Sequence, residues 1–303
     1  MVGSDQLQVI KNNSWQVGIL PHAGGSIAYG RIKRNGQWVD FMRPTSESSY
    51  NDPSACASYI LSPWSNRIRD GHFRFRGKDY QLRVNYYDGT AIHGTAKEFP
   101  WKIDSADDSH ITLSFDARQY SGVNFPFQFS TRQKFSLKGN RFSVETWIKN
   151  EDKSAMPAGF GHHPYFQRTL GSDEAQVEIP VTQYFVLENC LPSAGPVPLE
   201  PRIDFRQLRP LGTEFIDDAL TGRIDEKPIR FVYGSTEIAM HFDPVYQNVV
   251  FYLPQGKTYF ALEPVTNAND GFNLYDQGIA GNGVFILEPG QEKQGTFSLE
   301  IVK

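Results

Sequence analysis

The sequence of 303 residues contains only two cysteines, Cys56 and Cys190, which lie far apart in no CxxC or CxxH pattern. This spacing argues against a disulfide framework and a zinc ribbon, and we interpret both residues as buried free thiols. No apolar run approaches the ~20 residues that a membrane-spanning helix needs. Residues Met1 to Gln6 also lack the basic-then-apolar layout of a secretory leader. We therefore expect a soluble, cytoplasmic protein without a membrane partner.

An excess of basic residues is missing as well. Lysine and arginine total 30 against 34 aspartates and glutamates, for a formal net charge of -4. A nucleic-acid-binding protein would show a basic stripe, so nucleic acid is excluded as a partner and a neutral small molecule is favoured. The phosphate-loop signature is absent, and Gly24-Gly25 lacks the GxGxxG context. This glycine pair instead predicts a tight turn or a close approach of two backbones.

Amphipathic helices of ten or more residues are also lacking, whereas apolar residues at period two are frequent. The clearest pattern covers residues 127–137 and 142–148 on either side of Lys138-Gly139-Asn140, which predicts a long two-stranded ribbon. Asn35-Gly36 predicts another hairpin. Short strands and turn signals recur along the chain, so we expect an all-β sandwich or barrel-like assembly. No break in composition divides it, and we expect one domain over residues 1–303.

Two adjacent histidines, His162 and His163, precede Pro164-Tyr165-Phe166 and are the first candidate for a chemical site. Histidine exchanges a proton near neutral pH more readily than other side chains. Pro164 restricts the backbone of His163 to an extended conformation. Neighbours in an extended segment point to opposite sides, so both histidines should not enter one pocket. We assign His162 to structure.

Several motifs occur in an order that resembles the aldose 1-epimerase, or mutarotase, family. They are Asn66-Arg67-Ile68 with the following glycines and phenylalanines, His93-Gly94, Gly161-x-His163-Pro164-Tyr165-Phe166, Asp217 and Leu262-Glu263-Pro264. The resemblance covers nearly the whole chain. It implies a galactose-mutarotase-like fold, a large antiparallel β-supersandwich with few or no long helices. It also implies interconversion of the α and β anomers of a free hexose such as glucose or galactose, without a cofactor or a metal.

The resemblance also implies catalytic roles. Glu263 would be the general base that takes the proton of the C1 hydroxyl, and His163 the general acid that protonates the ring oxygen. Each such group contributes typically ~10²–10⁴-fold. We predict that nearby negative charge holds His163 protonated. His93 would lie on the other side of the sugar and donate to a hydroxyl or stabilise charge at the ring oxygen, unless it is a structural histidine before a turn glycine.

Substrate contacts follow from the same resemblance. Arg67 with Asn66 would hold vicinal hydroxyls through the fixed fork of guanidinium donors, although a surface ion pair is the alternative for this arginine. Asp217 would accept hydrogen bonds from two sugar hydroxyls, and its neighbour Asp218 is interpreted as a turn or cap residue. Aromatic rings could stack on the apolar face of the sugar, although such rings more often belong to a core. The candidates for stacking are Phe166, Trp101 and Trp64.

Four alternatives remain open at the level of sequence. His93, His163, Asp217 and Glu263 are all metal-ligand types, but no HxH or HExxH spacing supports a metal site. Asp217 and Glu263 could be the two carboxylates of a glycosidase. A non-catalytic carbohydrate-binding protein is the third possibility. The fourth is a phosphosugar 1-epimerase, because basic residues lie near the motifs, namely Arg69, Lys97 and Arg168, although such charges are more often solvated.

Overall fold

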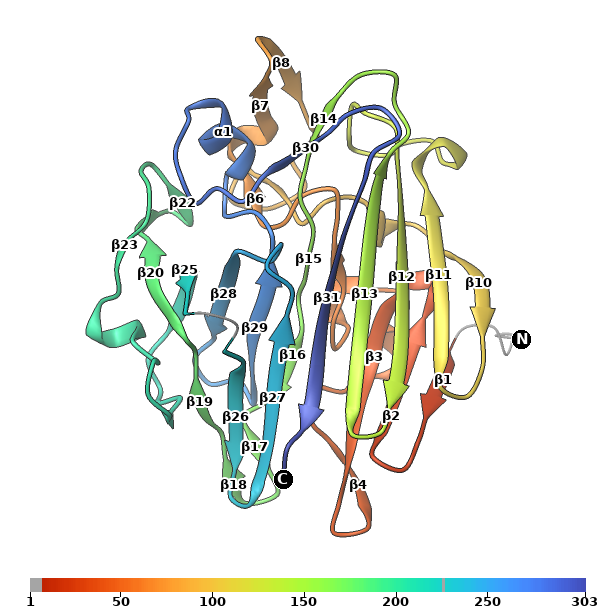
Figure 1. Cartoon of the computed structure of the whole chain (residues 1–303), viewed down its shortest axis with the longest axis vertical. Helices are drawn as coiled ribbons and strands as arrows, with labels where there is room; N and C mark the ends of the chain where they lie inside the picture. Colours follow the sequence, from red (N-terminus) through yellow and green to blue (C-terminus); the bar gives the residue numbers. More distant parts are fainter. Residues whose placement is uncertain (1–6, 225–226) are drawn as a thin grey trace.

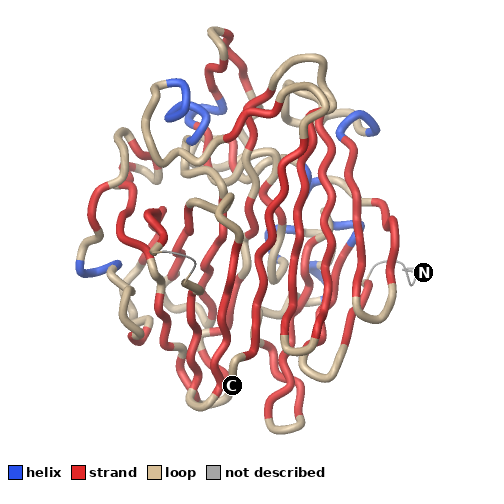
Figure 2. Tube along the Cα trace, viewed as in Figure 1, coloured by secondary structure: helices blue, strands red, loops and turns tan. Residues whose placement is uncertain are grey.

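A computed structural model describes residues 7–224 and 227–303, and strands dominate both ranges (Figures 1 and 2). The expectation about a leader rests on residues 1–6, which lie outside the described residues. The one α-helix in the described ranges is α1, Gly271–Asp276. None of the described helices has the length and apolarity needed to cross a bilayer. The prediction of an all-β fold without long helices is therefore confirmed.

A nine-stranded antiparallel sheet forms one layer, and it contains the ribbon predicted from the period-two pattern. Strands β12 and β13 pair over ten residues, from Phe129 opposite Asn150 to Lys138 opposite Arg141. Their side chains alternate between buried and accessible, because neighbours on a strand face opposite sides. In spatial order the sheet contains β10 (Lys102–Ala106), β11 (His110–Asp116), β12 (Phe129–Lys138), β13 (Arg141–Asn150), β31 (Glu292–Ile301), β27 (Thr236–Phe242), β26 (Ile229–Tyr233), β19 (Gln176–Glu178) and β24 (Arg209–Pro210).

An eight-stranded antiparallel sheet forms the second layer. Its longest strands, β25, β28 and β29, are neighbours, and β25 and β29 carry the predicted site residues Asp217 and Glu263. The spatial order is β23 (Val197–Pro198), β20 (Val181–Phe185), β25 (Ile216–Arg223), β28 (Asn248–Leu253), β29 (Tyr259–Val265), β15 (Gly161–His162) and β5 (Ile60–Leu61), while β16 (Tyr165–Gln167) pairs with β29 beside β15.

A four-stranded sheet and several short hairpins complete the fold. The hairpin predicted at Asn35-Gly36 is confirmed, because β3 and β4 pair on either side of these two residues. The four-stranded sheet contains β1 (Gln8–Lys11), β2 (Trp15–Leu20), β3 (Ser26–Arg34) and β4 (Gln37–Asp40). The two-stranded pairs are β6 (Arg67–Ile68) with β9 (Ala91–Ile92), β7 (His72–Phe75) with β8 (Lys78–Gln81), β14 (Met156–Ala158) with β30 (Phe285–Leu287), β17 (Thr169–Leu170) with β18 (Asp173–Glu174), and β21 (Leu187–Glu188) with β22 (Leu191–Pro192).

Short 3-10 turns connect several of these strands, and one of them, η5, carries residues of the site described below. The turns are η1 (Pro21–Ala23), η2 (Glu47–Ser49), η3 (Pro53–Ala55), η4 (Arg69–Gly71), η5 (Ala96–Glu98), η6 (Ala117–Gln119) and η7 (Pro201–Ile203).

Aromatic side chains fill the space between the two large sheets. The ring of Phe231 on β26 lies 4.7 Å from that of Phe166 on β16 and 6.1 Å from that of Phe260 on β29, between ring centroids. His162 on β15 lies 4.7 Å from Phe297 on β31. Rings from both sheets thus interdigitate in one apolar layer. The opposite face of the eight-stranded sheet is left available for a site.

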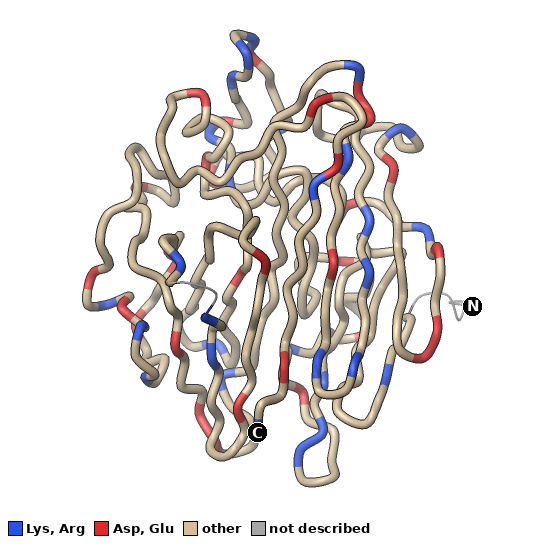
Figure 3. The backbone as a smooth tube through the Cα atoms, viewed as in Figure 1, with Lys and Arg blue, Asp and Glu red and all other residues tan. Residues whose placement is uncertain are grey.

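Charged residues of both signs are interspersed over the sheets and loops (Figure 3). On the solvent face of the nine-stranded sheet they form cross-strand pairs, such as Lys134 with Glu145 at 3.7 Å. Exposed pairs of this kind contribute little stability, about 0–1 kcal/mol each. The charged pairs on this face therefore contribute little to the stability of the fold.

Candidate active site

A cleft of about 570 Å³ lies on the face of the eight-stranded sheet that points away from the nine-stranded sheet. Strand alternation explains which side chains reach it. On β29, Phe260 and Leu262 point into the core between the sheets, so Glu263 points the other way. On β25 and β28, Asp217 lies directly opposite Tyr252, and both side chains line the cleft. Six of the eight predicted site residues line it: Asn66, Arg67, His93, His163, Asp217 and Glu263.

His163 and Glu263 form the central contact of the cleft. Nε2 of His163 lies 3.1 Å from Oε1 of Glu263, and the two side chains are 8% and 2% exposed. The other nitrogen of His163 and the other oxygen of Glu263 have no hydrogen-bond partner among the described residues. An acid and a base are thus in direct contact, and each has one polar atom left for a ligand.

Burial sets the protonation of this pair. It lowers the pKa of His163 to about 3, and the positive charges of Arg43 and Lys97 act in the same direction. Burial also raises the pKa of Glu263 well above its usual value, with the charge of Asp217 adding to the shift and Arg67 opposing it. Both shifts favour a neutral carboxylic acid beside a neutral imidazole. The prediction that His163 is held protonated by nearby negative charge is therefore wrong.

His93 is placed by a short antiparallel pair, β6 with β9, in which Arg67 lies opposite Ile92. Its backbone N–H donates to the carbonyl of Asn66 at 2.9 Å, and both residues have positive φ, 64° for His93 and 54° for Asn66. Left-handed backbone is uncommon outside glycine and clusters at functional sites. The ring of His93 lies 5.4 Å from that of His163, too close for a sugar between them. His93 therefore lies beside His163 in the cleft, and its contact with the sugar stays a prediction.

Arg67 is buried in the cleft, which excludes the surface ion pair considered for it. Its Nε donates to Oδ2 of Asp88 at 2.8 Å, and its Nη1 donates to Oδ1 of Asn66 at 3.3 Å. The same Asn66 oxygen accepts the backbone N–H of Arg67 at 2.9 Å. Asn66 thus orients the guanidinium, and Asp88 is a partner that sequence reasoning missed. The Asp88-Gly89 turn between the Arg67 and His93 motifs was its available signal.

The side chains of Asp217 and Asp218 point to opposite sides of β25, because neighbours on a strand alternate in direction. Asp217 lines the cleft, where burial raises its pKa and Arg67 opposes the shift. Asp218 points to the other side, where its two carboxylate oxygens accept hydrogen bonds from Nη1 and Nη2 of Arg202, at 2.7 and 2.8 Å. Asp218 is therefore half of a bidentate ion pair and not a turn or cap residue. The choice of Asp217 as the cleft residue agrees with this geometry.

The three candidates for stacking, Phe166, Trp101 and Trp64, lie outside the cleft. Phe166 is fully buried between the sheets, and Trp101 packs in the core with its indole N–H donating to the carbonyl of Ala96. Trp64 is fully buried as well. These three assignments are corrected: period two shows that a ring alternates with its neighbours but not which face meets the ligand.

Tyrosines supply the aromatic walls instead. Tyr59 and Tyr165 flank His163, with ring centroids 4.8 and 4.4 Å from its imidazole. Tyr252 lies on the wall formed by β28, and the largely exposed Tyr87 lies at the rim. In the sequence, the pair Tyr86-Tyr87 within a polar loop was the feature from which this aromatic rim could have been predicted. Phenolic rings offer both an apolar face and a hydroxyl, which suits a sugar.

His162 confirms the alternation argument made from sequence. Its Nε2 lies 2.8 Å from Oγ1 of Thr146 on β13, and the residue is 2% exposed. It therefore belongs to the interface between the two large sheets, while the adjacent His163 lines the cleft.

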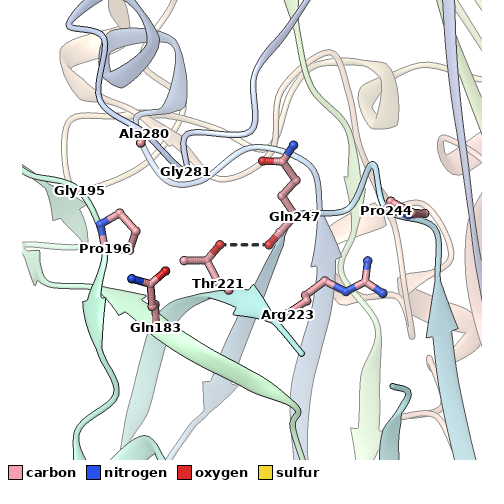
Figure 4. Close-up of a pocket in the computed structure, with 10 residues that line it drawn as sticks. Gln183, Gly195, Pro196, Thr221, Arg223, Pro244, Gln247, Ala280 and Gly281 are labelled. Atoms are coloured by element: carbon pink, nitrogen blue, oxygen red, sulfur yellow. Dashed lines mark hydrogen bonds between the residues drawn. The ribbon is translucent and has the colours of Figure 1, made fainter. Parts of the chain in front are cut away.

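No group of three or more histidine, cysteine, aspartate or glutamate side chains suited to a metal ion occurs in the described parts of the chain. A second cavity, of about 790 Å³, lies farther along β25 (Figure 4). Thr221 donates there to the carbonyl of Gln247, and Arg223 donates to backbone carbonyls, including that of Phe242 at 2.9 Å. The residues of the described ranges that line it include no carboxylate and no histidine. The described lining of this cavity thus holds no acid and base pair, whereas that of the cleft does.

Comparison with known sequences decides the family. The sequence model of the aldose 1-epimerase family matches residues 6–300. The chain belongs to the aldose 1-epimerase family. Two relatives from Escherichia coli K12, both described as uncharacterized, share this similarity. YphB is 24% identical over 278 residues, 88% of this chain and 91% of that protein, and YihR is 27% identical over 256 residues, 82% of this chain and 80% of that protein.

Solved structures of this family share the fold. A galactose mutarotase-like protein from Clostridium acetobutylicum superposes with a TM-score of 0.85 at 20% identity, covering 97% of this chain and 94% of that chain. Galactose 1-epimerase from Lactobacillus acidophilus superposes with a TM-score of 0.77 at 14% identity, covering 97% and 93%. At these identities the likeness establishes the galactose mutarotase-like β-sandwich, as predicted, and no more.

Proposed function

We propose that this aldose 1-epimerase family member interconverts the α and β anomers of a free hexose by general acid and base catalysis. The observation that carries the proposal is the buried contact of 3.1 Å between His163 and Glu263 in a cleft also lined by Arg67 and Asp217. The reaction needs one group that removes the proton of the C1 hydroxyl and another that protonates the ring oxygen.

Ring opening starts from the form of the pair in which Glu263 is a carboxylate and His163 an imidazolium. Glu263 takes the proton of the C1 hydroxyl, C1 becomes a carbonyl carbon, and the bond from C1 to the ring oxygen breaks. His163 gives its proton to that oxygen. The open-chain aldehyde rotates about the bond from C1 to C2, and the reverse transfers close the ring with the other configuration. No co-reactant is consumed.

The protonation preference of the His163 and Glu263 pair bears on this sequence of steps. A carboxylate with an imidazolium and a carboxylic acid with a neutral imidazole contain the same number of protons. Burial favours the neutral form, because it raises the pKa of Glu263 and lowers that of His163 to about 3. Ring opening converts the charged form into the neutral form. Ring opening therefore ends in the form of the pair that burial favours, and the charged form from which it starts is reached by transfer of a proton from Glu263 to His163.

Substrate positioning falls to the other polar residues of the cleft. Arg67 presents guanidinium donors held by Asp88 and Asn66, and Asp217 presents a carboxylate on the neighbouring wall. A donor and an acceptor on adjoining walls match a pair of sugar hydroxyls, each of which can donate and accept. The tyrosine rings supply apolar faces for the C–H surface of the sugar.

Substitution of Glu263 by glutamine tests the proposal. The amide keeps the shape of the side chain but cannot accept the proton, so kcat should fall by about 10²–10⁴-fold while sugar binding is retained. Polarimetry of freshly dissolved α-glucose and α-galactose measures the rate. The matched control is Glu145→Gln on the solvent face of the nine-stranded sheet, which should leave the rate unchanged.

Two other outcomes would reject the proposal. Release of reducing sugar from a glycoside, without acceleration of anomer exchange, would make the protein a glycosidase that uses Asp217 and Glu263. Anomer exchange at the spontaneous rate, together with sugar binding, would leave a carbohydrate-binding protein.

A further inference from the structure

A groove of about 340 Å³ continues the cleft beyond Asp217, and the proposed mechanism does not use it. The groove and the cleft share Cys190, Phe215 and Asp217 in their linings, so the two spaces are continuous. Pairing of β20 with β25 ends at Phe185 opposite Ala219, and the groove opens beyond that pair. Its volume falls at the lower end of the range of small-molecule sites, about 300–1,000 Å³. The space therefore suits one ring of a ligand whose remainder lies in the cleft.

Two exposed apolar side chains line this groove. Phe215 directly precedes β25 and is 55% exposed, and Val186 directly follows β20 and is 57% exposed. The ring of Phe215 meets that of Tyr252 nearly at right angles, with the ring centroids 6.2 Å apart. Exposed apolar groups rimmed by polar residues are a mark of ligand-binding grooves. An exposed aromatic ring in such a place offers a flat face to the C–H surface of a sugar.

A network of hydrogen bonds forms the polar wall of the groove. The hydroxyl of Tyr184 donates to Oε1 of Glu200, and Nε of Arg202 donates to Oε2 of the same carboxylate at 3.3 Å. A carboxylate has about four lone-pair sites, so Glu200 keeps acceptor capacity for the hydroxyls of a ligand. Among the described lining residues, three carboxylates, those of Glu200, Asp217 and Asp218, face one cation, Arg202. This excess of negative charge disfavours an anionic ligand group and favours hydroxyl donors.

The direction of the groove identifies the part of a sugar that would reach it. Glu263 on β29 and Asp217 on β25 are separated by β28, which places two strand spacings of about 4.8 Å each between them. In a pyranose with its C1 hydroxyl at Glu263 and its ring oxygen at His163, the ring atoms farthest from these two are C3 and C4. Asp217 and the groove therefore face the hydroxyls at C3 and C4. C6 is attached to C5 beside the ring oxygen, and so lies on the histidine side.

We propose that the groove is a subsite for a second sugar ring, so that the substrate is a reducing disaccharide joined through O3 or O4 of the ring held in the cleft. This rests on the function proposed above. The second ring stacks on Phe215, and its hydroxyls donate to the free lone pairs of Glu200.

The test compares anomer exchange for glucose with that for disaccharides of glucose. Laminaribiose and nigerose are joined through O3, cellobiose and maltose through O4, and gentiobiose through O6. At least one of the first four should exceed glucose in kcat/KM by about tenfold, the gain expected from one or two added hydrogen bonds. Gentiobiose should gain nothing. Phe215→Ala should remove most of the gain, whereas the matched control Tyr275→Ala, which removes an exposed ring on α1 outside both cavities, should keep it.

Three results would overturn the proposal: no O3- or O4-linked disaccharide exceeds glucose, gentiobiose gains as much as the others, or the ratio is unchanged in Phe215→Ala. Thermal melting checks folding, and Phe215→Leu repeats the comparison should the alanine variant unfold. Calorimetric binding of the same sugars to the wild type and to Phe215→Ala is independent of catalysis. A protein that binds the disaccharides through Phe215 without accelerating anomer exchange would retain this inference and lose the proposed enzymatic function, so the two failures are distinguishable.

Discussion

The adjacent residues His162 and His163 offer the sharpest test of the structure, because one lies between the sheets and the other in the cleft. We consider the matched substitutions His162→Asn and His163→Asn. The second removes the proposed general acid, so kcat should fall by about 10²–10⁴-fold. The first removes the contact of 2.8 Å with Thr146 and leaves a buried hydroxyl with fewer partners, which costs about 1–3 kcal/mol of unfolding free energy. Activity at a permissive temperature should be retained in His162→Asn.

The pH dependence of stability sharpens the test for His162. Burial lowers its pKa from 6.5 to about 3 in the folded protein, so between these values the unfolded chain binds one more proton. Its contribution to stability is complete above pH 6.5 and is lost as the pH falls. From pH 7 to pH 5 the loss for one such group is about 2 kcal/mol. The difference in unfolding free energy between wild type and His162→Asn should shrink by that amount over this range.

Urea unfolding at pH 7, 6 and 5 measures the stability difference, and polarimetry measures the rates of both variants. A difference that stays constant from pH 7 to pH 5 would show that His162 titrates in the folded protein as it does in the unfolded chain. A folded His162→Asn that loses catalysis, or a fully active His163→Asn, would refute the assignment of the two faces.

Two further predictions follow from neighbouring pairs. Asp217→Asn should raise KM for the sugar by about tenfold, because one charged acceptor is lost. Asp218→Asn should lower the melting temperature and leave KM unchanged, because Asp218 pairs with Arg202 outside the cleft. Melting curves and steady-state rates check both variants, and a change of KM in Asp218→Asn would contradict the geometry. Phe166→Leu should lower the free energy of unfolding by about 1–3 kcal/mol, because it leaves a cavity between the sheets, and KM should be unchanged. A raised KM without loss of stability would show that Phe166 contacts the sugar.

Much of the fold was open to prediction because it depends on local chemistry. Asn35-Gly36 accepts the positive φ that a tight hairpin requires, and the apolar residues of 127–148 repeat at the period of a strand. The order of the family motifs then indicated the larger arrangement. Alternation also separated His162 from His163, because this argument needs only the direction of successive side chains.

Several features of the site could not be predicted in this way. Phe166 and Tyr165 are equally aromatic neighbours, and only the packing of the eight-stranded sheet on the nine-stranded sheet decides that Phe166 is enclosed while Tyr165 flanks His163. The tyrosines of the cleft come from separate strands and loops whose convergence no local pattern specifies. Lys97 resembled a solvated surface charge until the fold enclosed it.

The sequence by itself determined the all-β architecture, the family and which residue types could act as acid and base. The tertiary structure decided the directions of their pKa shifts, their neighbours and which aromatic rings line the cleft. The physical reason is that desolvation and charge interactions depend on what surrounds a side chain in space. Glu263 and His163 lie a hundred residues apart in the sequence, and only the fold brings Nε2 of His163 within 3.1 Å of Oε1 of Glu263.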